Sequence, residues 1–190
     1  VGELNQIKDL TEFERRYAFI EKHLRNGKVY LETFRGSQTI AGERLFEIKS
    51  FFEKKGIRTA GGLTTVGHDA AGSFGSLCYS SPAQMKALQA AVEFTAGFFD
   101  EIILDDFYFT NCKCPLCIAE KGDRSWSAYR MERLGEVTRE TIIGPAHRVN
   151  PGVRLICKFP NWYEGFQETG YDLEHRPWQF DGIYTGTETR

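Results

Sequence analysis

Two adjacent carboxylates follow a short apolar run near the middle of this chain of 190 residues. The run, Ile102 to Leu104, suits a strand covered on both faces, and Asp105 and Asp106 come directly after it. Burying an unpaired charge is expensive, so these carboxylates must be hydrated, hydrogen-bonded or used in chemistry. Because ligands bind at the carboxyl ends of parallel strands, this pair is the first candidate for catalysis.

Three cysteines follow in a Cys-x-Cys-x-x-Cys arrangement, at Cys112, Cys114 and Cys117. Closely spaced thiolates suit zinc, which takes four ligands in a tetrahedron. Cys78, in a polar loop ahead of an expected helix, is the best fourth ligand. Cys157 lies within an expected strand and is interpreted as a core thiol.

Disulfide-bonded or free cysteines are the alternative to a structural zinc site. Five cysteines are an odd number, which excludes a fully paired disulfide framework. A redox-active pair would need a helix beginning at Cys114, and the sequence does not predict one there. A hydrolytic zinc is a further alternative, but four thiolates leave no open position for water.

Helical and extended patterns alternate along the chain. Thr11 with Glu14, and Ser81 with Gln84, are expected to cap two helices. A loop rich in Gly and Ser is expected from residue 67 to residue 79. The expected helices span residues 11–25, 41–55, 81–97 and 125–143, and the expected strands span residues 28–34, 57–65, 102–104, 153–160 and 180–185.

Five strands separated by long connections predict parallel pairing with helices outside the sheet. No Gly-x-Gly-x-x-Gly follows the first strand and no Walker loop occurs, which argues against a nucleotide-binding, doubly wound sheet. The sequence therefore gives no reason to expect an organic cofactor. We therefore expect an α/β fold in which residues 1–190 form a single, incomplete domain. That domain is a partial (β/α)8 TIM barrel with about five parallel strands present and strands missing at both ends.

Composition and motifs argue against several other functions. The formal net charge is −2 and no basic stripe occurs, so neither nucleic acid nor an anionic membrane surface is an expected partner. No apolar run approaches the roughly 20 residues that a membrane span needs. No His-x-His follows a strand and no Gly-x-Ser-x-Gly occurs, which disfavours an amidohydrolase-type metal centre and a serine hydrolase.

Carboxylates at strand ends are the groups that glycoside hydrolysis requires, one protonated and one ionised. Asp106 and Asp105 are the leading candidates, and Glu188, after the last expected strand, is another. Successive side chains of a strand point to opposite faces, so we expect only one of the adjacent aspartates to face a substrate.

Aromatic and polar side chains near other strand ends could hold a sugar. Flat rings match the apolar C–H faces of sugars, although loop packing is the alternative role for each ring. The candidates for substrate binding are Tyr108, Asn161, Trp162, His68 and Arg35.

The central part of the chain resembles the zinc-containing β-galactosidases of glycoside hydrolase clan A. The resemblance covers Leu77 to Tyr129, under a third of the chain, and rests on Leu-Cys-Tyr-Ser-Ser-Pro, the strand ending Asp-Asp, Cys-Lys-Cys-Pro-Leu-Cys and a helix with Trp126. It implies a structural zinc on Cys78, Cys112, Cys114 and Cys117, and hydrolysis of a carbohydrate substrate. Uncharacterised barrel-type glycosidases with an Asp-Asp-Phe strand end look closer still.

The strand end departs from that family's pattern. The family has Asn-Glu, with Glu as the acid/base, where this chain has Asp105-Asp106. The resemblance makes Asp106 the counterpart of the acid/base and Asp105 that of the residue contacting the sugar. It also implies that these are barrel strands two to six, with the nucleophile on a seventh strand outside this chain.

The favoured function is hydrolysis of glycosidic bonds by carboxylate acid/base catalysis. The alternative is a non-catalytic barrel that binds glycans or serves as a scaffold. The enzyme class favours a periplasmic or extracellular location, although no targeting signal is visible in the sequence.

Overall fold

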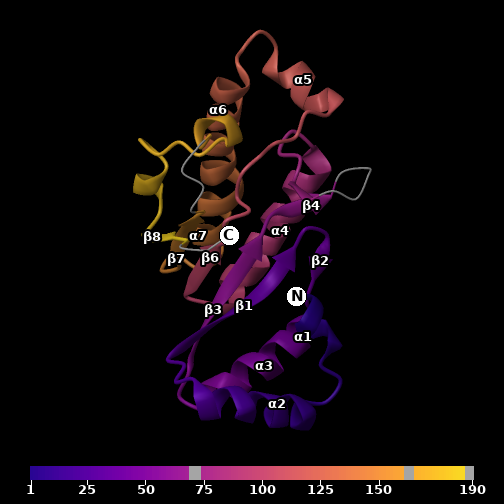
Figure 1. Cartoon of the computed structure of the whole chain (residues 1–190), viewed down its shortest axis with the longest axis vertical. Coiled ribbons are helices and arrows are strands. Elements are labelled where there is room, and N and C mark those ends of the chain that lie inside the picture. The colour runs from indigo at the N-terminus through magenta and orange to yellow at the C-terminus, as the bar shows by residue number, and fades with distance from the viewer. Residues whose placement is uncertain (69–73, 161–164, 187–190) are drawn as a thin grey trace.

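The computed structural model describes residues 1–68, 74–160 and 165–186. Figure 1 shows an elongated molecule with α5 and α6 at one end and α2 and α3 at the other. The helices are α1 (Gly2–Gln6), α2 (Leu10–His23), α3 (Gly42–Lys54), α4 (Pro82–Phe98), α5 (Pro115–Lys121), α6 (Trp126–Val137) and α7 (Gly144–Val149), with a π-helical segment (Thr138–Ile143) and two short 3-10 turns (Gln167–Thr169 and Pro177–Gln179).

A six-stranded sheet in the order β2-β1-β3-β6-β7-β8 lies at the centre. All neighbouring pairs are parallel except β1 with β2. The prediction of about five parallel strands is therefore confirmed. The strands are β1 (Lys28–Arg35), β2 (Gln38–Thr39), β3 (Arg58–Thr64), β6 (Glu101–Leu104), β7 (Arg154–Phe159) and β8 (Gly182–Thr185).

The parallel strands follow one another across the sheet in chain order. A doubly wound sheet reverses its strand order at a switch point, whereas successive strands of a barrel wall are added at one edge. Closure into a barrel is not seen among the described residues. The α/β class is thus confirmed, and the TIM barrel remains a proposal.

A second, two-stranded sheet lies within the segment expected to be a loop. It pairs β4 (Val66–His68) with β5 (Phe74–Ser76) in antiparallel fashion. The Leu77 N–H donates to Thr65 O at 3.0 Å, which extends this hairpin by one residue on each strand.

Helix caps agree with the sequence at one of two sites. The Ser81 side chain accepts from the Gln84 N–H, as expected at the start of α4, but the Gln84 side chain accepts from Cys78 N at 2.6 Å instead of completing a capping box. At α2 the cap is Asp9, whose carboxylate accepts from Thr11 N at 2.9 Å. The expected cap at Thr11 was wrong, because α2 begins at Leu10, one residue earlier than expected, and Asp9 is its N-cap.

Only the first part of the helix expected over residues 125–143 is a regular α-helix. Beyond α6 the hydrogen bonds widen, and Gly144 N donates to Arg139 O, five residues back. Pro145 has no N–H and its ring crowds the carbonyl four residues earlier, so a regular α-helix cannot pass through it. The π-helical segment absorbs this mismatch and α7 then continues.

One face of the sheet packs against helices α4, α6 and α7 and is apolar. Leu63, Ile102, Leu104 and Leu155 contribute to this core and are almost fully buried. Cys157 lies among them with no exposed surface, which confirms its interpretation as a core thiol.

The opposite face carries polar side chains and is concave. In a flat sheet, β1 and β8, four strand spacings apart, would be about 19 Å from each other. The hydroxyls of Tyr30 on β1 and Tyr184 on β8 nevertheless lie 3.1 Å apart. Side chains on a flat sheet stand parallel and would not meet, so the sheet must curl toward this face, which we call the concave face.

Candidate active site and cysteine cluster

Asp105 and Asp106 occupy the turn that follows β6. Asp105 N donates to Leu63 O at 3.0 Å, which extends the β6 pairing by one residue. The Asp105 carboxylate then accepts from Asp106 N at 3.0 Å, and Tyr108 N donates to Asp105 O at 3.1 Å. These bonds reverse the chain immediately after the strand and fix both aspartates at its carboxyl end.

Both aspartate side chains converge on Lys158 of β7. Lys158 Nζ lies 2.9 Å from Asp106 Oδ2 and 3.5 Å from Asp105 Oδ1. The expectation that only one aspartate would face the site was therefore wrong. Strand alternation does not apply to Asp106, because β6 ends at Leu104 and the chain turns at Asp105.

The pairing register places further polar residues beside this group. Arg35 pairs with Thr64 across β1 and β3, and Lys158 pairs with Tyr184 across β7 and β8. Leu104 pairs with Leu63, so Asp105, the next residue, lies beside Thr64. Five residues thus lie side by side at the carboxyl ends of neighbouring strands, and we call them the strand-end row: Arg35, Thr64, Asp105, Lys158 and Tyr184.

Glu32 lies below the strand-end row on the concave face. It accepts from Thr64 Oγ1 at 2.6 Å and forms an ion pair with Arg35 at 2.8 Å. Gly62, its neighbour on β3, has no side chain, and a methyl group added there would lie 3.4 Å from Glu32 Cα. Arg35, a predicted substrate contact, thus lies in the row but is held by Glu32.

Tyr108, another predicted substrate contact, is part of the core. Its side chain has no exposed surface, and its hydroxyl lies 2.7 Å from Thr138 Oγ1. A fully buried ring cannot stack on a sugar, so this assignment is corrected. Tyr171 supports the site from the same core, because its hydroxyl donates to Asp106 O at 2.7 Å.

The remaining predicted contacts are not placed by the structure. Glu188, Asn161 and Trp162 lie outside the described residues. The backbone of His68 ends β4, and nothing is described of its side chain. Lys158 is a further residue of this site, and its position near the end of the strand expected over residues 153–160 was the available signal for it.

A cavity of about 1230 Å³ lies apart from the aspartates. It is bounded by α4, by the turn between β1 and β2 and by the β4–β5 hairpin, with Phe34 and Phe94 among its apolar walls. Three of the clustered cysteines reach its edge, but neither Asp105 nor Asp106 lines it. None of the five residues of the strand-end row lines this cavity.

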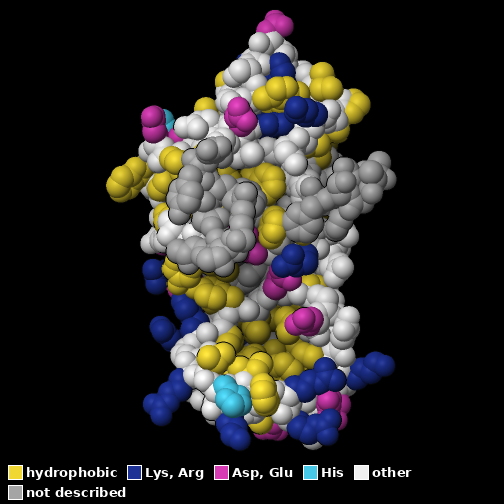
Figure 2. All heavy atoms as spheres, in the orientation of Figure 1, with side chains coloured by type: hydrophobic (Ala, Val, Ile, Leu, Met, Phe, Trp, Pro, Cys, Tyr) yellow, Lys and Arg dark blue, Asp and Glu magenta, His cyan; other side chains and the backbone are white. Residues whose placement is uncertain are grey.

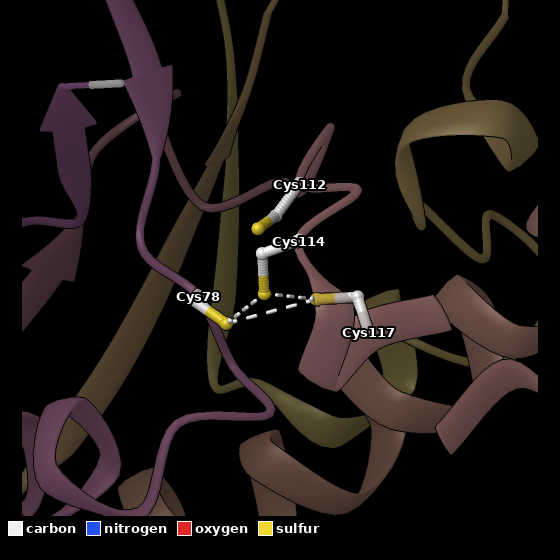
Figure 3. A group of neighbouring side chains, drawn as sticks. All are labelled: Cys78, Cys112, Cys114 and Cys117. Atoms are coloured by element: carbon white, nitrogen blue, oxygen red, sulfur yellow. Dashed lines mark hydrogen bonds between the residues drawn. The ribbon is translucent and has the colours of Figure 1, made fainter. Parts of the chain in front are cut away.

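Four cysteines meet above α4, as Figure 3 shows. Their sulfur atoms all lie within 4.8 Å of one another, and three of the separations are 3.5, 3.6 and 3.7 Å. A tetrahedral site with metal–sulfur bonds of about 2.3 Å has sulfur–sulfur edges of about 3.8 Å, whereas a disulfide bond measures about 2.05 Å. This cysteine cluster consists of Cys78, Cys112, Cys114 and Cys117.

The thiols differ in how readily they ionise. Burial raises the pKa of Cys112 to about 11 and holds the pKa of Cys78 well above its ordinary value. The backbone N–H of Cys117 lowers the pKa of Cys114 to about 7. A short helix, α5, does begin after Cys114, contrary to the expectation used against a redox pair. The close approach of all four sulfurs nevertheless suits one shared cation better than an isolated dithiol.

Fold and site together define an α/β protein of the kind whose chemistry takes place at the carboxyl ends of parallel strands. The chain belongs to the family described as probable glycosyl hydrolase, catalytic domain, whose model matches residues 1–190. This match supports a glycoside hydrolase at a coarse level. It does not extend to the particular resemblance with zinc-containing β-galactosidases.

A relative from Saccharolobus solfataricus, described as an uncharacterized protein, is 28% identical over 214 aligned residues. The alignment covers 97% of this chain and 36% of that protein, so the chain spans about a third of its relative's length. No solved structure matches the chain significantly. Among the described residues, no helix is both long and apolar enough to cross a membrane.

Proposed function

We propose that this chain carries part of the active site of a glycoside hydrolase, at the carboxyl ends of β6 and β7. The observation that carries the proposal is the convergence of Asp105 and Asp106 on Lys158 Nζ, at 3.5 and 2.9 Å, in a chain of a glycosyl hydrolase family. Glycoside hydrolysis depends on carboxylates at a fixed separation from the scissile bond, and this turn fixes two of them.

Asp106 is the leading catalytic carboxylate in this proposal. Its ion pair with Lys158 favours the ionised form, which suits a base that takes a proton from water, or a nucleophile. To act as a general acid, Asp106 would first have to leave Lys158 and take up a proton. Asp105, which is more exposed, is positioned to accept hydrogen bonds from sugar hydroxyls.

The reaction balances without any further reactant. Water adds to the anomeric carbon while the bond to the leaving oxygen breaks, one carboxylate accepts the proton of water, and a protonated carboxyl group returns a proton to the leaving oxygen. Asp106 supplies the first of these carboxyl groups. The resemblance places only the nucleophile of the related enzymes on a strand outside this chain, and Glu188, beyond the described residues, remains a candidate for the second carboxyl group.

The test uses the full-length protein with a panel of nitrophenyl glycosides and an assay for reducing sugars released from oligosaccharides. Asp106→Asn is expected to lower kcat by about a hundredfold or more, with substrate binding retained. Asp123→Asn is the matched control, because Asp123 is exposed in the turn between α5 and α6. Asp105→Asn is expected to raise KM more than it lowers kcat.

A non-catalytic, glycan-binding or scaffold barrel is the competing function. Wild-type protein that binds glycans on an array but releases no sugar from any of them would favour it. Equal activity of wild type and Asp106→Asn would remove Asp106 from catalysis.

We further propose that the cysteine cluster holds a structural zinc ion. Four soft sulfur donors at tetrahedral separations fit this ion, and no ligand position would be left for water. The ion would tie the loop before α4 to α5 and so brace the strand ends that carry the aspartates.

The zinc proposal predicts one zinc per chain by elemental analysis. Cys117→Ser should lose the ion and unfold at lower temperature, because metal binding contributes directly to folding. Cys157→Ala is the control, since this buried thiol lies in the core, away from the cluster, and its loss should leave the zinc content unchanged. A disulfide among the four cysteines in the purified protein would contradict the proposal.

A further inference from the structure

Three cations gather around Trp126, beside the cysteine cluster. The guanidinium carbon of Arg130 lies 4.8 Å from the centre of the Trp126 ring, Lys121 Nζ lies at 5.5 Å and Lys113 Nζ at 5.7 Å. Lys113 stands between Cys112 and Cys114 in the sequence. Figure 2 shows Lys and Arg side chains next to hydrophobic ones at the top of the visible face, over α5 and α6.

These cations lack an acidic counterpart in the described part of the chain. The salt bridges there, which include Arg124 with Glu132 and Arg133 with Glu136, involve none of the three. Contact with an aromatic ring offsets only part of the repulsion between like charges. Their grouping therefore calls for a nearby anion.

Arg130 makes this requirement sharper because it is buried. Arg130 is only 5% exposed, and its Nη1 donates to the backbone oxygen of Glu168 at 2.5 Å. Its Nε and Nη2 atoms have no hydrogen-bond partner among the described residues. A buried guanidinium without a counter-charge is costly, and a carbonyl oxygen compensates it only in part.

The cysteine cluster can supply this negative charge. It lies beside the three cations, because Lys113 stands between Cys112 and Cys114 and contacts the same Trp126 ring as Arg130. Neutral thiols or disulfides carry no charge. Four thiolates around a divalent ion, in contrast, leave two negative charges in excess.

We propose that Arg130 is a positioning residue that balances the excess negative charge of a metal–thiolate centre, with exposed Lys113 and half-buried Lys121 as supplements. The inference rests on the proposed metal site and is independent of the proposed hydrolysis. It gives a physical reason for the buried arginine that a disulfide or a set of free thiols does not give.

The test measures transfer of zinc from the purified full-length protein to the chelating dye 4-(2-pyridylazo)resorcinol. Arg130→Met keeps the bulk of the side chain and removes the charge, and it should speed zinc release about tenfold or more, as expected when a partner of a metal ligand is lost. Arg130→Lys should recover most of the wild-type rate.

Arg176→Met is the matched control. Arg176 is 1% exposed, donates to the backbone oxygen of Gly170 and also has two nitrogen atoms without a partner, but it packs on Tyr108 and Tyr171. Its loss costs a comparable buried charge without touching the cluster, so zinc release should match that of the wild type.

Three outcomes would overturn the inference: folded Arg130→Met that releases zinc at the wild-type rate, a wild type whose cysteines are oxidised and metal-free, or binding of inorganic phosphate that needs Arg130 while zinc release does not. If Arg130→Met does not fold, the double variant Lys113→Gln/Lys121→Gln replaces it. Faster release from that variant supports the proposal, and unchanged release overturns it.

Discussion

Lys158 has two carboxylates within 3.5 Å of its Nζ atom. One cation shared by adjacent aspartates reduces the electrostatic repulsion between them. The side chains of Lys158 and Asp106 are 25% and 13% exposed, so solvent screens this attraction incompletely. The position of the proposed catalytic carboxylate, Asp106, therefore depends on Lys158, a residue of a different strand.

Lys158→Met is expected to lower kcat/KM by about tenfold or more, because Asp105 and Asp106 would repel each other without the cation that holds both at the strand ends. The measurement is kcat/KM of the full-length protein. Lys158→Arg should retain most of the wild-type value, and an unchanged kcat/KM in Lys158→Met would show that the ion pairs do not position the carboxylates.

At this scale the sequence predicted residue types better than residue roles. Asp105, Asp106 and Arg35 were recognised from their places after apolar runs, and all three lie at strand ends. The convergence on Lys158 could not be predicted, because it depends on the turn that follows β6 and on β7 being the strand beside it. Tyr108 failed as a contact because its sequence position did not reveal the core beneath it.

Close packing between β3 and α4 sets the position of the next element, β6. A side chain at Gly61 would meet Phe99 at 2.9 Å and Thr95 closer still. Thr95 is fully buried, and its Oγ1 lies 2.6 Å from that of Thr33 on β1. Neither neighbour can move aside without opening the interface between sheet and helix.

Gly61→Ala is expected to destabilise the protein by about 1 to 3 kcal/mol through overpacking. Urea denaturation measures this as a lower midpoint. Gly27→Ala is the control, because nothing lies within 4 Å of its added methyl group and its φ angle is not positive. That substitution should be neutral or slightly stabilising, and equal losses in both variants would contradict the packing argument.

Strands and most helices were predictable because their signals are local. Periodicity and turn residues located the five parallel strands to within about two residues. The β4–β5 hairpin was missed, since its strands are short and glycine-rich. The π-helical segment was missed as well, because its cause, Pro145, lies beyond the end of the helix that the pattern predicted.

Across the whole sheet, a polar cluster on the concave face links strands that are not neighbours. The Glu101 carboxylate accepts from Lys28 Nζ at 2.5 Å and from the Tyr30 hydroxyl at 2.7 Å, and Arg154 lies 3.5 Å away. Burial raises the pKa of Glu101, but the hydrogen bonds from Lys28 and Tyr30 together lower it by more. The pKa of Glu101 is therefore below its ordinary value.

Glu101→Gln should lower stability at pH 7 by about 1 to 2 kcal/mol, a typical cost for losing charged hydrogen bonds. A depressed pKa contributes stability that is complete above the ordinary value of about 4.3 and is lost as pH falls through the folded-state value. The difference between wild type and variant should therefore shrink below about pH 4. Urea midpoints at several pH values measure it, and exposed Glu174→Gln serves as the control.

The contact between Tyr30 and Tyr184 has a consequence for the strand ends above it. Their hydroxyls meet across three intervening strands, so this contact helps to set the curvature of the sheet. A flatter sheet would move Arg35, Asp105 and Lys158 farther apart. Because Tyr184 belongs to the strand-end row while Tyr30 lies near the start of β1, this one contact makes the spacing of the row depend on the far side of the sheet.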